Sequence, residues 1–599
     1  MNEVQEQNQF RTAKKGVLRG AALMGAAMLV SKALGTMQKI PLQNIAGDRV
    51  FGIYNAVYPL YQLLLVMVTA GFPIAVSLVV AEHEVAGDED GARRVLRASS
   101  LLMFVSGAIG FVLLWLGAER IAIWLGDSAA APAVRTASLA LWVAPVMAAL
   151  RGYFQGRGQM LPSAVSQLSE QTVRVAGMLA LLAIGWHYGW SDAKLAAGAT
   201  SGSAIGGAAG LAVIAGLWLR WERVLGRVQV QVQVQEQGRE REQEQMQEQE
   251  QEQVLVQEQM QEQVRDTRQR QEEERQQQVS QRKSSGGQLF GMMKRLAMLA
   301  VPVTLGALAV PALGVVDAFT VPRLLRAGTG VTPAEAMTLF GLYSRGQPLV
   351  QLVVMVAGAM GAALVPALAA ARVRRDAAAS RQQAAFVLRA AWGIGAAAAL
   401  GLALLAEPIN VMLYADDAGS RTFALVGCTA LAGTVSAIAA AVLQGLGAVR
   451  APALFMLAAA ALKAAFNAAL VPAYGTAGAA CAGIAALTAA ALLGTGAVRR
   501  ACGAAMPARS AAGIGLALAV MAAVLVLAER GGAPLLGLAL PPRAAACALA
   551  LGGTALGGAL FAAAALRFGG VTARELRALP GGEALAARLS RWRLLPAGD

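Results

Sequence analysis

The chain has 599 residues, of which 56% are hydrophobic, and it carries a formal net charge of +15. A soluble domain cannot keep so apolar a surface in water, so the composition excludes an ordinary soluble protein and indicates a membrane protein. The basic residues gather in short loops on one predicted side of the membrane, as the positive-inside rule requires. Contact with anionic lipid headgroups therefore explains the charge, and nucleic acid is not expected as a partner.

Apolar stretches of about 20 residues, the length that crosses a bilayer, recur along almost the whole chain. They are residues 17–38, 54–80, 98–117, 134–153, 163–185, 195–219, 296–321, 346–370, 384–406, 422–446, 452–472, 475–497, 511–528 and 544–566. We predict an all-α integral membrane protein of the cell membrane with about fourteen transmembrane helices. The polar N-terminus does not resemble a cleaved signal sequence. An even helix count places both termini on one side, which we expect to be cytoplasmic.

The N-lobe, residues 1–220, is predicted to contain six helices, and the first carries Lys32 and Lys39. Their spacing of seven puts both lysines on one face of the helix. An ionisable residue near the bilayer centre costs about 2.5–3.5 kcal/mol and needs a partner or a wet cavity. Such cations can bind an anionic group through charge-assisted hydrogen bonds. The alternative is that Lys39 only extends to the membrane interface.

The fourth and fifth helices of the N-lobe add further polar residues. Arg151 and Gln155 lie in the RGYFQG passage that ends the fourth helix, where either a cytosolic gate or an interfacial anchor fits. Glu170 and Arg174 lie on one stripe of the fifth helix. Because residues at i and i+4 can pair, an internal salt bridge and contact with substrate are both open for them.

Residues 221–289 interrupt the apolar pattern with a run built mainly from Gln, Glu, Arg and Val. Gln and Glu favour helices, so part of this segment can extend the sixth or seventh helix. It has no sustained apolar stripe to bury. We interpret it as a cytoplasmic low-complexity insert, either a repeat expansion or an arm that docks a partner.

The C-lobe, residues 290–500, is predicted to hold helices seven to twelve. Asp317 stands in the apolar seventh helix, and Arg345 lies near the start of the eighth. Lys463 and Asn467 share a face of the eleventh helix at i and i+4. All four are candidates for binding substrate in a cavity, and an Asp317–Arg345 ion pair is the structural alternative. Residues 501–599 add two helices and a basic tail.

The two halves contain similar passages. Gln155-Gly156 ends the fourth helix and Gln444-Gly445 the tenth, each followed by a proline. The basic loops after helices two and eight both lead into a Val-Leu-Arg-Ala sequence. Both similarities fall six helices apart in the same orientation. We therefore predict two six-helix lobes related as parallel repeats.

Several passages resemble the MurJ/SpoVB family of lipid II flippases, whose superfamily includes the MATE exporters. They are SKALGTMQKIPLQNIAGDRVFGIYN, RGYFQGRGQMLPSAVSQLSEQTVRV, VPVTLGALAVPALGVVDAFTVPRLLRAG and FGLYSRGQPLVQL. The resemblance implies a V-shaped bundle that moves an undecaprenyl-pyrophosphate-linked sugar to the outer leaflet by alternating access. That activity would serve peptidoglycan or spore cortex synthesis, with peptidoglycan synthases as candidate partners.

The resemblance also assigns residues. Lys32 falls at the cation of the family's S-R/K-x-L-G motif, here Ser31 to Gly35, and this cation is implied to face the central cavity. A second cation found in some members is Gln38 here, and Lys39 is the candidate substitute. A cation near the start of helix eight, here Arg345, is likewise implied to face the cavity.

Two other functions compete with a flippase. A MATE-like exporter coupled to Na⁺ or H⁺ needs buried carboxylates, and Asp317 and Glu170 keep that alternative open. An enzyme of polyprenyl-phosphate metabolism needs paired acids or a His/Ser constellation, and the sequence offers none. The four cysteines are scattered singly and no glycine-rich phosphate loop is present, so we expect neither metal nor cofactor. A transporter, not an enzyme, is the expected class.

Overall fold

The computed structural model describes residues 23–251, 266–504, 508–570 and 588. Within this part of the chain, twelve helical stretches are long and apolar enough to cross a membrane. The chain is therefore a multi-pass membrane protein. Its predicted cytoplasmic termini and the middle of the predicted insert lie outside the described residues.

Two of the twelve stretches are hairpins, because each is interrupted by a non-helical glycine. Gly47 has φ 78° and ψ 174°, and Gly475 has φ 58° and ψ −136°. Across the first break, Gln38 Nε2 donates to Tyr54 Oη at 3.2 Å, whereas a straight helix would hold these residues about 24 Å apart. Dividing both hairpins gives fourteen span-length segments among the described residues, which confirms the predicted fold.

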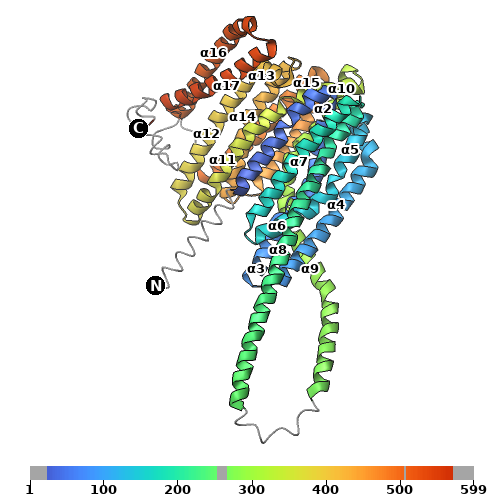
Figure 1. The fold of residues 1–599 in the computed structure, drawn as a ribbon. Helices are drawn as coiled ribbons and strands as arrows, with labels where there is room; N and C mark the ends of the chain where they lie inside the picture. The colour runs from blue at the N-terminus through green and yellow to red at the C-terminus, as the bar shows by residue number, and fades with distance from the viewer. Residues whose placement is uncertain (1–22, 252–265, 505–507, 571–587, 589–599) are drawn as a thin grey trace.

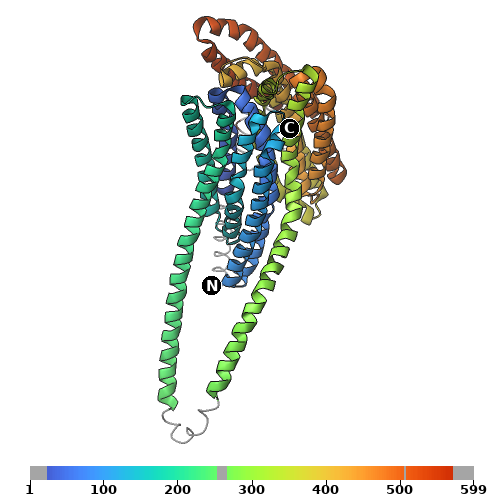
Figure 2. The same cartoon turned by 90° about the vertical axis from the view of Figure 1, so that its right-hand side faces the viewer.

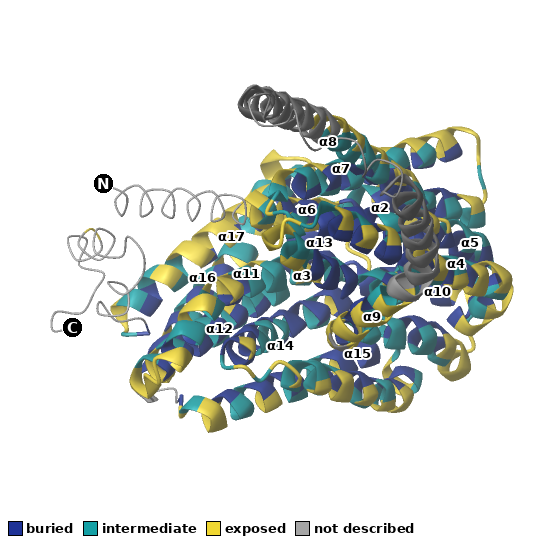
Figure 3. Cartoon of the chain, turned by 90° about the horizontal axis from the view of Figure 1, so that it is seen from below, coloured by how far each residue is buried: buried dark blue, intermediate teal, exposed yellow. Residues whose placement is uncertain are grey.

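The first half of the described chain forms the N-lobe and the second half the C-lobe (Figure 1). The N-lobe comprises the helical segment 23–37, α2 (Lys39–Thr69), α3 (Phe72–Val85), α4 (Glu89–Leu125), α5 (Ala131–Ser138), α6 (Ala140–Gly156), α7 (Met160–His187) and α8 (Asp192–Gln251). The C-lobe comprises α9 (Asp266–Thr329), α10 (Pro333–Ser344), α11 (Gln347–Val373), α12 (Ala377–Leu404), α13 (Ala406–Tyr414), α14 (Ser420–Gly445) and α15 (Ala451–Cys502). The last pair, α16 (Ala508–Ala539) and α17 (Pro542–Arg567), lies at the edge of the bundle beyond α11 and α12 (Figure 3).

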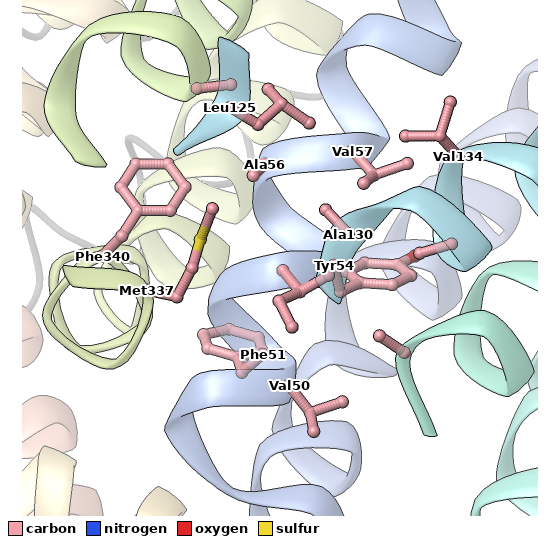
Figure 4. Close-up of a cluster of buried hydrophobic side chains, with 14 of the residues drawn as sticks. Val50, Phe51, Tyr54, Ala56, Val57, Leu125, Ala130, Val134, Met337 and Phe340 are labelled. Carbon is pink, nitrogen blue, oxygen red and sulfur yellow. The ribbon is translucent and has the colours of Figure 1, made fainter. Parts of the chain in front are cut away.

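The cores of the two lobes join at one end of the bundle and separate at the other. At the end far from the insert, Phe51 and Val57 of α2 share a core with Met337 and Phe340 of α10 (Figure 4). At the insert end, one core lies among α3, α4 and α6 with α8 and the first part of α9, and a separate core lies among α11, α12, α14 and α15. The lobes therefore meet tightly at the end opposite the insert.

The contact between α2 and α10 depends on two glycines. A Cβ atom on Gly52 would overlap the backbone oxygen of Met337, and one on Gly341 would overlap the backbone oxygen of Asp48. Only residues without a side chain let the two backbones approach so closely. The junction of the lobes is therefore a direct contact between backbones.

The similar passages at Gln155 and Gln444 form the same turn. The helix α6 ends at Gly156 and α14 at Gly445, and each is followed by a glycine in the left-handed region, Gly158 (φ 72°) and Gly447 (φ 85°). The next residue donates its N–H to the carbonyl five positions earlier, at 2.9 and 2.8 Å. This is the hydrogen bond of a Schellman turn, and its recurrence supports a duplicated six-helix unit.

The loops before α4 and α12 also match. Each has one left-handed residue, Gly87 (φ 69°) or Arg375 (φ 56°), followed by an aspartate. Asp88 and Asp376 then cap the next helix by accepting a backbone N–H at 2.7 and 2.9 Å. The capping carboxylates satisfy donors that the first helical turn leaves free. The backbone hydrogen bond from Gly91, together with His83 and Arg94, lowers the pKa of the Asp88 carboxyl.

Arg375 has a left-handed backbone conformation, and a glycine, Gly87, stands at the equivalent position of the N-lobe. We expect Arg375→Gly to raise the free energy of unfolding by about 0.5–1 kcal/mol, because relief of steric strain exceeds the entropy gained by the unfolded chain. Thermal unfolding in detergent measures the change. Gly87→Arg is the matched control and should lower stability. A loss of stability in Arg375→Gly would contradict the prediction.

The helices α8 and α9 continue beyond the bundle into the predicted insert (Figures 1 and 2), in keeping with the helix propensity of Gln and Glu. Both helices are attached to the N-lobe where they leave it. Glu222 of α8 pairs with Arg93 of α4 at 3.1 Å, and Arg295 of α9 pairs with Glu82 of α3 at 2.6 Å. Ala300 of α9 also belongs to the N-lobe core at the insert end.

Candidate functional site

Arg345 lies between α10 and α11, fully buried, at the end where the lobes meet. It forms two forked ion pairs, which together we call the interlobe cluster. Its Nε and Nη2 donate to Asp48 of the N-lobe at 2.8 and 2.6 Å. Its Nη1 and Nη2 donate to Asp416 of the C-lobe at 2.6 and 3.0 Å. Bidentate pairs of this kind are strong and geometrically specific.

The remaining surroundings of Arg345 also hold it in place. Nη1 makes a further contact with Asn410 Oδ1 at 3.4 Å, and the guanidinium lies 5.0 Å from the centroid of the Tyr414 ring. Hydrogen bonds from Arg345 lower the pKa of the Asp416 carboxyl, which lies in a loop outside the spans. Because these partners occupy the donors of Arg345, the side chain joins the lobes in this conformation and is not open to a ligand.

Asp317 of α9 is the centre of the C-lobe cluster, which also contains Tyr343, Lys463 and Asn467. Its Oδ2 accepts from Lys463 Nζ at 2.6 Å and from Tyr343 Oη at 2.9 Å, and its Oδ1 accepts from Asn467 Nδ2 at 3.2 Å. All four residues are buried. The alternative prediction of an Asp317–Arg345 pair is wrong, because Lys463 on α15 neutralises Asp317 and two other aspartates neutralise Arg345.

Glu170 of α7 is the centre of the N-lobe cluster, together with Arg151, Arg174 and Ser166. Its two carboxylate oxygens accept from Arg151 Nη2 at 2.9 Å and from Arg174 Nη2 at 3.0 Å. Arg151 also donates to Ser166 Oγ, at 2.9 and 3.2 Å. The internal Glu170–Arg174 pair, one of the two alternatives for these residues, is thus present. Arg151 turns into the N-lobe towards α7.

The helices α7 and α8 pack closely, so that α8 covers the N-lobe cluster. A Cβ on Gly206 of α8 would lie 2.6 Å from Cβ of Arg174, and one on Gly210 would lie 2.9 Å from Cβ of Glu170. Small residues at such spacing let membrane helices pack closely. Gln155, the other predicted gate residue, lies half-buried in the last turn of α6, one helical turn beyond Arg151.

Lys32 and Lys39 share one helix face but differ in surroundings. Lys39 is 5% exposed, and its ammonium lies 5.8 Å from the centroid of the Tyr58 ring. Lys32 is exposed, and among the described residues no carboxylate pairs with it. Lys39 lies near the end where the lobes join, and Lys32 lies further towards the end where their cores separate. Lys32 is exposed together with its apolar neighbours Leu29 and Val30, and a cation in an apolar span is stable only where water or lipid headgroups reach it.

The sequence analysis missed Asp48 and Asp416. Asp48 lies in the predicted loop after the first span, and Asp416 lies beside Asp417 in the loop between the predicted ninth and tenth helices. Both loops fall on the predicted side of the membrane where helix eight begins. Sorting the acids by membrane side would have placed Asp48 and Asp416 among the possible partners of Arg345, together with Glu335 and Asp417.

Comparisons with known proteins agree with this architecture. The sequence profile of the polysaccharide biosynthesis protein family matches residues 17–235. The uncharacterized membrane protein YabM of Bacillus subtilis (strain 168) is 30% identical over 583 residues, which cover 96% of this chain and 97% of YabM. The lipid II flippase MurJ of the same organism is 34% identical over 217 residues, 35% of this chain and 39% of that protein.

A solved structure of the lipid II flippase MurJ in an inward closed conformation shares the fold. It superposes with a TM-score of 0.59 at 10% sequence identity, covering 91% of this chain and 98% of the solved chain. At 10% identity, the similarity to the solved structure shows a common fold and nothing more. The match to YabM, in contrast, covers nearly the full length of both chains. The chain therefore belongs to the MurJ/SpoVB-type family of polysaccharide biosynthesis membrane proteins.

Proposed function

We propose that this membrane transporter is a flippase for a lipid-linked pyrophosphate sugar of the lipid II type. It would carry the precursor from the inner to the outer leaflet by alternating access, for peptidoglycan or spore cortex synthesis. In this proposal the insert and both termini are cytoplasmic, so the insert end faces the inner leaflet. Anionic lipids would contact the basic loops, and peptidoglycan synthases would receive the product.

The observation that supports the proposal is the difference between the two ends of the bundle. The interlobe cluster and the contact between Gly52 and Gly341 close one end, and the lobes have separate cores at the other. Lys32 is exposed and without an ion partner among the described residues, on the helix that leads from the separated end to the closed one. In this proposal water reaches Lys32, and a lone cation in a wet, membrane-embedded space suits a pyrophosphate.

The state of the buried carboxylates disfavours a MATE-like exporter driven by a cation. Asp317 is neutralised by Lys463 at 2.6 Å, and Glu170 is shared by Arg151 and Arg174. A cation taken from solution would have to displace these side-chain cations. Neither carboxylate is free to hold Na⁺ in this conformation.

Rescue of bacteria depleted of their own lipid II flippase tests the proposal. The wild-type chain should restore growth and transport of the lipid-linked precursor. We expect Lys32→Ala to lose rescue by at least about tenfold, because one charge-assisted hydrogen bond contributes about 1.5–3 kcal/mol, while membrane abundance and thermal stability stay normal. Lys32→Arg should retain part of the activity.

Lys194→Ala removes another exposed lysine, at the start of α8, and is the matched control that should rescue normally. Failure of the wild-type chain to rescue, despite normal abundance, would refute a lipid II-like substrate. Full rescue by Lys32→Ala would remove Lys32 from the substrate site.

A further inference from the structure

The interior of the N-lobe holds more positive than negative charge. Lys39, Arg151 and Arg174 are cations that lie largely out of solvent, with side-chain exposures of 15% for Arg151 and 11% for Arg174. Within the described part of the chain, the only carboxylate paired with any of them is Glu170, which the two arginines share. Lys39 has the Tyr58 ring as its charge-stabilising neighbour.

Buried charges without a counter-charge are costly, so proteins pair them or bind an ion beside them. A cation–π contact contributes about 0.5–2 kcal/mol, far less than the desolvation of an ammonium group. One carboxylate cannot neutralise three cations. The described side chains therefore leave an excess positive charge inside this lobe.

Two hydrogen-bond donors in the same region have no partner among the described residues. They are Nε of Arg174 and Nε2 of Gln171, on side chains of residues that are 9% and 6% exposed. An arginine Nε can only donate, and a buried donor without an acceptor costs about 1–3 kcal/mol. Gln171 lies against the first helix, because a Cβ on Gly35 would be 2.8 Å from its Nε2.

These groups converge on one face of α2. Tyr54, Tyr58 and Tyr61 follow one another along that face, with the first two rings stacked at 5.5 Å and the next pair at 6.2 Å. Lys39 lies at the Tyr58 ring, and Gln171, one helical turn before Arg174 on α7, reaches the first helix beside Gly35. The positive edges of aromatic rings and their hydroxyl groups suit a weakly hydrated anion.

We propose that a small monovalent inorganic anion, such as chloride, binds inside the N-lobe between α2 and α7. Lys39 and Arg174 supply its charge partners, and the free donors of Arg174 and Gln171 supply hydrogen bonds. This site lies within the lobe and is separate from the exposed Lys32 at which we place the lipid pyrophosphate. It does not depend on the proposed flippase function.

The test is the thermal unfolding of the purified full chain in detergent, without any lipid substrate. Chloride or bromide replaces the large anion gluconate step by step at constant ionic strength. We expect a saturable rise in Tm of at least about 2 °C, because a ligand that binds only the folded state stabilises it. Lys39→Met should abolish the rise, and the surface variant Lys194→Met should keep it.

Equal Tm values in gluconate, chloride and bromide would overturn the proposal and would indicate that Lys39 is buried uncharged. An undiminished rise in Lys39→Met would also overturn it. If Lys39→Met does not fold, Lys39→Arg should preserve the rise, and bromide soaked into crystals of the wild-type protein should give anomalous density beside Arg174. Absence of that density at saturating bromide would refute the site. Flipping plays no part in these readouts, so they succeed or fail separately from the transport assay.

Discussion

Replacing Arg345 by alanine is expected to lower the free energy of unfolding by about 3–5 kcal/mol, the usual cost of removing one partner from a buried ion pair. Arg345 is fully buried, and its loss leaves Asp48 and Asp416 facing each other without a cation. Thermal unfolding in detergent, with the wild-type chain alongside, measures the change. Arg345→Lys should restore little, because an ammonium cannot form two forked pairs.

The partners of Arg345 decide which second substitution repairs the loss. Adding Asp48→Asn and Asp416→Asn to Arg345→Ala should recover part of the stability, because both uncompensated charges disappear. Asp317→Asn should bring no repair, since Asp317 pairs with Lys463. Repair by Asp317→Asn and not by the other pair would contradict the interlobe cluster.

The same cluster has a defined pH dependence. Arg345 lowers the pKa of the Asp416 carboxyl below its ordinary value, which is about 3.9 in the unfolded chain. A depressed folded pKa adds stability that is fully present above the unfolded pKa and is lost as the pH falls through the folded pKa. The contribution of Asp416 should therefore remain constant at neutral pH and decline only in strong acid.

Adding a methyl group at Gly52 or Gly341 is expected to separate the lobes at their closed end. Each new Cβ would overlap a backbone oxygen of the other lobe, and backbone atoms cannot rotate away as a side chain can. Overpacking costs about 1–3 kcal/mol, which corresponds to a shift of about 5- to 150-fold in the balance between closed and open arrangements. Transport that requires closure at this end should fall by a similar factor.

A cysteine introduced at Met337 in a cysteine-free background reports this separation. Met337 is fully buried between the lobes, so an impermeant thiol reagent should modify the cysteine slowly in the wild-type background and faster with Gly52→Ala or Gly341→Ala. Gly358→Ala on α11 is the control, because a Cβ there meets open space. Unchanged labelling in both test variants would show that the junction tolerates a side chain.

Patterns among residues close together in the sequence predicted the membrane spans, the repeated turns and one ion pair. Hydropathy alone placed fourteen spans, and the similar passages at Gln155 and Gln444 form matching turns. The rule for residues four apart offered the Glu170–Arg174 pair, which the structure contains. These features involve neighbours in the chain, whose spacing fixes their geometry.

Long-range pairing could not be predicted in the same way. Arg345 and Asp48 are 297 positions apart, and Asp317 and Lys463 are 146 positions apart. Which acid meets which base depends on how the helices are arranged side by side, and a single sequence does not record that. The burial of Lys39 and the exposure of Lys32 likewise depend on which side chains pack against each residue, such as Tyr58 beside Lys39, and not on their spacing along the chain.

The attachment of α8 and α9 has a consequence for how this protein carries so long an insertion. A segment that joins two domains limits, through its length, how far these domains can move relative to each other. Here both ends of the insertion are fixed to one lobe, by Glu222 with Arg93 and by Arg295 with Glu82. The chain passes to the other lobe only deeper in the bundle, between Ala300 and Asp317 of α9. If the lobes move as the proposed alternating access requires, the insertion can lengthen or shorten over evolutionary time without changing how far they move.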